Sequence, residues 1–327
     1  MRIAIVGAGA IGGYLGVRLA LAGAEVTLIA RGAHLEAIRR DGLALEYADG
    51  RRDVARPAMA TADMASAGPQ DAVIVAVKTQ ALSALAAPMR ALYGPDTSVV
   101  FAQNGIPWWY FMRHGGPHEG RRIESVDPGG RIAAEIEIAR VIGCVVYPAA
   151  TIERPGVIRH IEGNRFTLGE PDGSKSERVL ALSALFTAAG LKAPARPDIR
   201  SEIWIKLWGN LSVNPISALA RATVDVIIAD PGARALASAM MAEAQQVAEA
   251  LGIRFPLTIE RRLKMAEDIG AHRTSMLQDV EAGKPTEVDA LVGAVAELGR
   301  LVGVPTPHID AIYASMKLLD RVVSGGL

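Results

Sequence analysis

The chain has 327 residues, which is enough for two domains of ordinary size that each bury a core. It carries 35 Lys and Arg residues against 35 Asp and Glu residues, so its formal net charge at pH 7 is zero. This balance gives no indication of a nucleic-acid or membrane partner, and no apolar run approaches the ~20 residues of a membrane span. The single cysteine, Cys144, excludes an intramolecular disulfide and favours a reducing, cytoplasmic location. No Cys, His and carboxylate cluster has metal-ligand spacing, so we expect no metal.

The first hundred residues alternate short apolar strands with helices. Strands are predicted at 2–6 and 25–29, with helical spacing between them at 11–22. Two more strands, at 72–77 and 98–101, flank a helix at 80–90. Strands that alternate with helices in this way are typical of a parallel sheet in an α/β fold.

The pattern loosens after residue 103 and becomes helical after residue 197. We expect three strands and a helix in the middle of the chain, at 141–147, 157–161, 165–168 and 177–189. Further on, the sequence predicts helices and almost no strand, at 198–220, 231–251, 256–270, 286–302 and 307–323. The chain is therefore predicted to form an α/β domain at 1–197 and an all-helical domain at 198–327.

A glycine-rich motif joins the first strand to the first helix. It reads Gly7-Ala8-Gly9-Ala10-Ile11-Gly12 and matches the pattern G-x-G-x-x-G in its proper context. The first glycine permits a tight turn, the second lets the backbone approach a pyrophosphate, and the third lets helix and strand pack closely. We therefore expect a Rossmann-type dinucleotide-binding domain. A ligand-free turn is the alternative, and a signal peptide is disfavoured because an apolar helix has little use for so many glycines.

The residue after the second strand indicates which nicotinamide cofactor is bound. An acidic residue there hydrogen-bonds the ribose 2′-hydroxyl, whereas an arginine accommodates a 2′-phosphate. Arg31 stands at this position and no carboxylate is near it. The sequence thus predicts NADPH (NADP+) as cofactor, the alternative being an arginine that is merely solvated at a loop edge.

Three polar residues share one face of a predicted helix. Lys206, Asn210 and Asn214 are four residues apart, a spacing that forms one stripe at 3.6 residues per turn. Apolar residues border the stripe, so we expect it to line a cleft. Asn214 precedes Pro215, which predicts a kink or a helix end at that point. A partly exposed lysine with capping asparagines is the alternative.

Two further segments complete a set of motifs that resembles the ketopantoate reductase (2-dehydropantoate 2-reductase) family. They are the segment 272–289, with Ser275 and Glu287, and the tripeptide Gln103-Asn104-Gly105, together with Lys78 after an earlier strand. The resemblance covers nearly the whole chain. It implies NADPH-dependent reduction of 2-dehydropantoate (ketopantoate) to pantoate by hydride transfer to the C2 carbonyl, in the biosynthesis of pantothenate and coenzyme A.

The resemblance also implies a role for each matching residue. Lys206 matches the general acid, which the chemistry needs because hydride addition develops negative charge on the carbonyl oxygen. Glu287 matches a catalytic carboxylate that orders the site. The matches to substrate-binding positions are Asn210, Asn214 and Ser275, and those to cofactor-binding positions beside the nicotinamide are Lys78 and Asn104. Structural alternatives are a helix cap for Ser275, a helix-dipole charge for Glu287 and a turn for Asn104.

Two segments depart from the family pattern. The aromatic run Trp108-Trp109-Tyr110-Phe111 opens a stretch to residue 130 that is longer than the usual connection. It is expected either to line or cover the substrate pocket, or to pack at a domain or subunit boundary. The run 216–226 lacks an asparagine that some relatives use to contact substrate.

These departures leave the substrate open between 2-dehydropantoate, which is favoured, and a different small 2-oxo acid. A non-catalytic NADP(H) sensor is a further alternative, which the presence of both Lys206 and Glu287 disfavours. Whether the chain forms a homodimer is also open.

Overall fold

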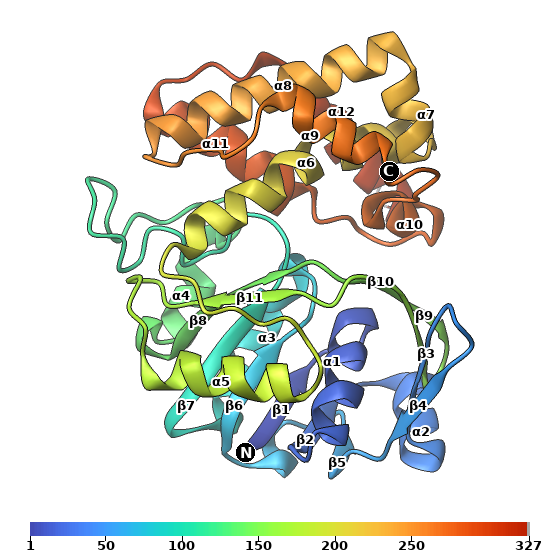
Figure 1. The fold of residues 1–327 in the computed structure, drawn as a ribbon. Coiled ribbons are helices and arrows are strands. Elements are labelled where there is room, and N and C mark those ends of the chain that lie inside the picture. The colour runs from blue at the N-terminus through green and yellow to red at the C-terminus, as the bar shows by residue number, and fades with distance from the viewer. Residues whose placement is uncertain (326–327) are drawn as a thin grey trace. The chain divides into compact units, whose positions relative to one another are not determined.

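A seven-stranded sheet, in the order β11-β8-β7-β6-β1-β2-β5, organises the N-terminal half of the chain (Figure 1). The computed structural model describes residues 1–325. The strands are β1 (Arg2–Val6), β2 (Glu25–Ile29), β5 (Met59–Thr61), β6 (Gln70–Val75), β7 (Tyr93–Ala102), β8 (Val141–Val146) and β11 (Phe166–Gly169). All neighbours pair in parallel except β11, which is antiparallel to β8. The central strands are apolar and buried almost throughout, as expected for a sheet covered on both faces.

A second, four-stranded sheet lies in the same half, in the order β4-β3-β10-β9. Its strands are β3 (Leu43–Glu46), β4 (Arg52–Ala55), β9 (Ala149–Arg154) and β10 (Val157–Glu162). Helix α1 (Ala10–Leu21) contacts strands of both sheets. A Cβ atom on Gly13 would lie 2.7 Å from Ile158 of β10, and one on Gly16 would lie 2.8 Å from Leu28 of β2. These two glycines therefore allow both sheets to pack closely on α1.

The remaining helices of this half are mostly short. They are α2 (Gly32–Asp41), α3 (Thr79–Met89), α4 (Arg131–Glu135) and α5 (Glu177–Ala188), with single turns η1 (Ala65–Ala67), η2 (Arg90–Leu92), η3 (Pro128–Gly130) and η4 (Ile138–Arg140). The buried side chains of α5 belong to the same hydrophobic core as those of the large sheet. Figure 1 shows α5 across one face of that sheet.

Helices alone follow from residue 199 on, within the described part of the chain. They are α6 (Ile199–Ala220), α7 (Val224–Ala229), α8 (Pro231–Ala250), α9 (Ile259–Glu267), α10 (Ser275–Glu281), the π-helical turn η5 (Asp289–Gly293), α11 (Ala294–Val302) and α12 (Pro307–Val323). Helix α6 runs through Pro215 to Ala220, so the prediction of a helix end at that point is wrong. The turns on both sides of Pro215 are buried, and their packing holds the helix despite the lost backbone hydrogen bond.

The contacts within the chain divide it into two units. The first comprises Met1–Gln103, Phe111–Arg122 and Gly130–Ile199, and the second comprises Asn104–Tyr110, Ile123–Gly129 and the chain from Arg200 on. Two short segments that precede the helices in sequence thus belong to the helical unit. The division predicted from the sequence, into 1–197 and 198–327, assigns both segments to the first domain instead.

The architecture confirms the predicted α/β fold class, with a mostly parallel N-terminal sheet and a helical C-terminal region. The sequence analysis missed the helices α2, α4, α7 and α10 and the short strands β3, β4, β5 and β9. Several of these strands are partly exposed and polar, so they lack the continuous apolar run by which the central strands were found.

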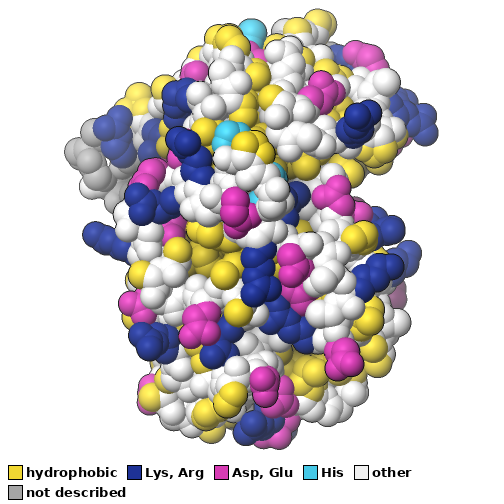
Figure 2. Space-filling model, turned by 90° about the vertical axis from the view of Figure 1, so that its left-hand side faces the viewer, with side chains coloured by type: hydrophobic (Ala, Val, Ile, Leu, Met, Phe, Trp, Pro, Cys, Tyr) yellow, Lys and Arg dark blue, Asp and Glu magenta, His cyan; other side chains and the backbone are white. Residues whose placement is uncertain are grey.

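The surface carries charges of both signs. On the face drawn in Figure 2, Lys and Arg side chains are interspersed with Asp and Glu. Among residues 1–325, no helix has the length and apolar character needed to cross a membrane.

Candidate active site

The first and third glycines of the motif are required by backbone geometry. Gly7 has φ +97°, and a Cβ atom there would lie 2.6 Å from Cγ1 of Val77. A Cβ atom on Gly12 would lie 1.9 Å from the carbonyl oxygen of Gly7. A side chain at either position would therefore force the loop away from β6 or from the first turn of α1.

The second glycine has a different surrounding. Apart from the adjoining backbone of the chain itself, no described heavy atom lies within 4 Å of the position that a Cβ atom on Gly9 would take. Gly9 is the N-cap of α1 and no side chain caps the helix, so Ala10 and Ile11 open it with backbone N–H groups that lack helical partners. Open space, backbone donors and the positive end of a helix dipole suit a pyrophosphate, so the loop fits a dinucleotide.

Arg31 and Lys78 lie at the same edge of the large sheet as this loop. Arg31 is exposed, follows β2 and is the N-cap residue of α2. Lys78 is half-buried, follows β6 and is the N-cap residue of α3. Because β6, β1 and β2 are parallel neighbours, their carboxyl ends meet at one edge, where α/β proteins bind nucleotides.

Three predicted site residues meet in the helical unit. The ammonium nitrogen of Lys206 donates a hydrogen bond of 2.7 Å to Oδ1 of Asn104. Nδ2 of the same amide donates one of 3.1 Å to Oε2 of Glu287. Asn104 thus uses both ends of its amide to join a cation to a carboxylate, which fixes the orientation of that amide. All three side chains are half-buried.

The backbone around Asn104 is fixed against the π-helical turn η5. Gly105 has φ +83°, and a Cβ atom there would lie 2.5 Å from the carbonyl oxygen of Ala290 in η5. The N–H of Ile106 donates to the same carbonyl at 3.0 Å. Glu287 lies two residues before the start of η5, so this docking places Asn104 beside it.

A side chain of η5 is itself held by α12. Asp289 accepts a hydrogen bond of 2.6 Å from the hydroxyl of Tyr313 and one of 2.9 Å from the ammonium of Lys317. Burial, and then the bond to Asp289, raise the pKa of Tyr313. The tyrosine therefore stays protonated and remains a donor at neutral pH, which helps to hold the turn that follows Glu287.

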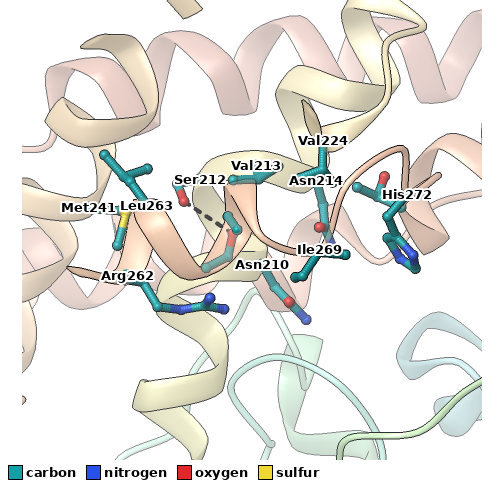
Figure 3. A pocket seen from close by; sticks show the side chains of 13 residues that line it. Asn210, Ser212, Val213, Asn214, Val224, Met241, Arg262, Leu263, Ile269 and His272 are labelled. Carbon is teal, nitrogen blue, oxygen red and sulfur yellow. Dashed lines mark hydrogen bonds between the residues drawn. The ribbon is translucent and has the colours of Figure 1, made fainter. Parts of the chain in front are cut away.

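A cavity of about 120 Å³ lies in the helical unit, between α6, α7, α8, α9 and the segment that leads into α10 (Figure 3). Asn210 and Asn214 of the predicted α6 stripe line it, whereas Lys206, the third residue of that stripe, is not among the described lining residues. Ser275 does not belong to the described residues that line it, and its side chain is exposed. The neighbouring Thr274 lines the cavity and caps α10 by accepting the N–H of Leu277 at 3.2 Å. The helix-cap role considered for Ser275 therefore falls to Thr274.

The cavity also contains residues that the sequence analysis did not single out as site residues. Arg262 and Met241 reach it from α9 and α8, and His272 from the segment before α10. No motif or spacing marks them, because each is on a different element from the Lys206 stripe. Val224 lines the cavity from α7, in the region where some relatives have an asparagine.

The aromatic run after Gly105 is packed inside the protein. Trp108, Trp109, Tyr110 and Phe111 are all buried. The hydroxyl of Tyr110 accepts a hydrogen bond of 2.7 Å from Nε1 of Trp204, and its carbonyl accepts one of 2.7 Å from Nε of Arg200. These four aromatic residues are also absent from the described lining of the cavity. The geometry thus favours packing over a pocket lining or cover.

Cys144 lies buried in β8. Within residues 1–325, no group of three or more His, Cys, Asp or Glu side chains is placed to hold a metal ion.

Known proteins match this chain over almost its full length. The model of the family "Ketopantoate reductase PanE/ApbA" matches residues 3–173, and that of its C-terminal domain matches residues 198–320. A 2-dehydropantoate 2-reductase of Mesorhizobium japonicum is 56% identical over 320 residues, which are 98% of each chain.

Solved structures agree with this result. A protein of Ralstonia solanacearum MolK2 assigned as a ketopantoate reductase superposes with a TM-score of 0.93 at 47% identity, over 98% of both chains. A PanE/ApbA family ketopantoate reductase of Ralstonia eutropha JMP134 gives a TM-score of 0.84 at 27% identity, over 99% of both chains. The chain belongs to the ketopantoate reductase family of oxidoreductases.

Proposed function

We propose that the protein reduces 2-dehydropantoate to pantoate with NADPH and so supplies pantoate for pantothenate and coenzyme A biosynthesis. The observation that carries this proposal is the hydrogen-bonded series Lys206–Asn104–Glu287. It provides a proton donor that is held in place by a neutral amide. The family and the 56% identical 2-dehydropantoate 2-reductase support the choice of substrate.

Lys206 acts as the general acid in this reaction. NADPH, when bound, supplies the hydride that adds to the C2 carbonyl carbon. The ammonium of Lys206 stabilises the negative charge that develops on the carbonyl oxygen and then donates a proton to it. Asn104 fixes the position of the ammonium group by accepting one of its protons at 2.7 Å.

Glu287 orders the site from the opposite end of the Asn104 amide. Its carboxylate accepts from Nδ2 and so keeps Oδ1 turned toward Lys206. Asn210 and Asn214 add amide groups that hydrogen-bond polar groups of the substrate.

The glycine loop and Arg31 hold the cofactor. Backbone N–H groups at the start of α1 bind the pyrophosphate, and Arg31 binds the 2′-phosphate that distinguishes NADPH from NADH. Arg31 is exposed after the end of β2, so no surrounding packing holds its guanidinium in one position.

The proposal is tested by following NADPH and NADH oxidation with 2-dehydropantoate, on the wild type and on Lys206→Ala. We expect a clear preference for NADPH and a fall in kcat of roughly 10²- to 10⁴-fold in the variant, the usual contribution of a positioned general acid. Binding of NADPH, measured by its fluorescence, should be unchanged. Turnover that survives in Lys206→Ala contradicts the assignment of the acid, and NADPH binding without any 2-dehydropantoate turnover in the wild type contradicts the substrate.

A further inference from the structure

A fixed positive charge lies at the cavity of the helical unit. Arg262, from α9, is half-buried and lines this cavity together with Asn210. None of the described lining residues is Asp or Glu. An arginine stays protonated at every relevant pH, so the lining of the cavity carries a permanent positive charge.

The guanidinium of Arg262 lies directly against α6. A Cβ atom on Gly209 would lie 2.1 Å from Nη2 of Arg262 and 2.8 Å from its Cζ. Gly209 follows Lys206 by three residues, which places it one turn away and about 4.5 Å further along the helix axis. The absence of a side chain at Gly209 therefore lets the guanidinium rest against α6, one turn along the helix from Lys206, at the cavity that Asn210 also lines. Figure 3 shows the side chains of Arg262 and Asn210 extending toward the same side of the view.

This spacing matches the chemistry of a 2-oxo acid. Its C1 carboxylate is bonded directly to the C2 carbonyl, so a carbonyl held at Lys206 places the carboxylate within a few ångströms. The other polar lining groups are poorly suited to hold that charge. Asn210 and Asn214 are neutral amides, the hydroxyl of Ser212 donates to carbonyl groups of its own helix, and Thr274 caps α10. The ring of His272 offers no pair of parallel N–H donors. A guanidinium instead offers paired N–H donors that match a carboxylate.

We propose that Arg262 binds the C1 carboxylate of the substrate and so selects 2-oxo acids over their neutral counterparts. The proposal rests on the function proposed above and adds a specificity-determining residue to it. The apolar lining from Val213, Val224 and Met241 then faces the alkyl part of the acid. The substrate would then be bound by the charge of Arg262 at its carboxylate end and by apolar contacts at its alkyl end. This accounts for a cavity that has both charged and apolar lining residues.

The test compares the charged acid with an uncharged analogue in wild type, Arg262→Gln and Arg262→Lys. We expect Arg262→Gln to raise KM for 2-dehydropantoate roughly 10- to 100-fold with a much smaller change in kcat, the usual cost of a lost charged hydrogen bond. Arg262→Lys should recover part of this loss because it keeps the charge. Inhibition by pantoate should weaken in Arg262→Gln, whereas inhibition by its neutral lactone should not.

Two further variants separate carboxylate binding from a structural role. Arg261→Gln removes the neighbouring arginine of α9, which is exposed and outside the described lining of the cavity, and should leave every constant unchanged. Gly209→Ala keeps the charge but displaces the guanidinium, and should raise KM for the acid as Arg262→Gln does. Melting temperature and NADPH affinity should be close to wild type in all variants.

An unchanged KM for the acid in Arg262→Gln, or equal weakening of pantoate and lactone, overturns the proposal. If the wild type does not reduce 2-dehydropantoate, the proposed function fails, and calorimetry with 2-oxobutanoate then decides the role of Arg262. Binding to the wild type but not to Arg262→Gln supports carboxylate recognition. Equal binding to both, or binding to neither, contradicts it.

Discussion

Asn104 contacts two of the other predicted site residues. The family resemblance places it beside the nicotinamide, among the cofactor-binding residues, and this stays a prediction. Its amide contacts Lys206 and Glu287, both from the helical unit. An amide is suited to this position because it has an acceptor for the lysine and a donor for the glutamate on one small planar group. Its orientation therefore controls where the ammonium nitrogen lies.

Replacing Asn104 by Asp is expected to lower kcat about 10- to 100-fold, since proton transfer depends on a positioned donor. The new carboxylate faces Glu287 without a donor, and like charges at this distance repel and raise the pKa of one of the two groups. The affinity for NADPH, measured by fluorescence titration, should change little. Gln103→Ala is a matched control, because Gln103 donates to the carbonyl of Val77 and not to Lys206. A large loss of NADPH affinity with unchanged kcat would instead assign Asn104 to the cofactor.

At the scale of elements, His34 of α2 connects the glycine loop to the turn between β9 and β10 through two hydrogen bonds. Nδ1 of His34, in α2, accepts the N–H of Gly156 at 3.0 Å, in the turn between β9 and β10. Its Nε2 must then carry the proton, and it donates to the carbonyl of Ala8 at 2.8 Å. Burial lowers the pKa of His34, and the bond to Ala8 opposes this with a smaller effect. The loop is therefore supported by a neutral imidazole.

This arrangement predicts a loss of stability and of NADPH affinity at acid pH. A pKa that is lower in the folded protein than the ordinary value of 6.5 means that the unfolded chain binds the proton more readily. The stabilisation is complete above that value and declines as the pH falls below it, because a protonated Nδ1 no longer accepts from Gly156. Between about pH 7 and pH 5, the stability and the NADPH affinity of the wild type should fall more steeply than those of His34→Asn. Parallel pH profiles for the two proteins would count against this role.

At the scale of the whole molecule, the helical unit includes two segments from the first half of the sequence. The carboxylate of Glu297, in α11, accepts backbone N–H groups of Glu124 and Ser125, both at 2.8 Å. Tyr110 is bonded to Trp204 and Arg200 of α6. The segments 104–110 and 123–129 therefore supply buried contacts and one candidate active-site residue, Asn104, to helices that follow much later in the sequence.

We therefore expect that residues 198–327, expressed alone, do not unfold cooperatively. The fragment lacks Tyr110, so Trp204 would lose its buried hydrogen-bond partner. It also lacks Glu124 and Ser125, so the Glu297 carboxylate would lose its backbone donors. Near-ultraviolet circular dichroism and a thermal melt provide the measurement, with the full chain as the reference. Co-expression with residues 1–197 should restore a cooperative transition, because it returns both segments. A fragment that melts alone near the temperature of the full chain would contradict this prediction.

The local pattern of the sequence determined much of the first half of the fold. The strands at 2–6 and 25–29 and the glycine loop between them were predicted at nearly their observed bounds. Periodicity and glycine content act within a few residues, so they can be read without tertiary information. The same holds for the stripe of Lys206, Asn210 and Asn214, which lies on one helix.

The sequence could not decide features that depend on segments far apart in the chain. Helix α6 continues through Pro215 because buried packing on both sides outweighs the local preference of the Asn-Pro pair. Asn104 and Glu287 are 183 residues apart in the sequence, and they meet because the backbone after Asn104 docks against η5. Arg262 reaches α6 where Gly209 leaves room for its guanidinium. Each of these contacts is made by tertiary packing, which no local periodicity encodes.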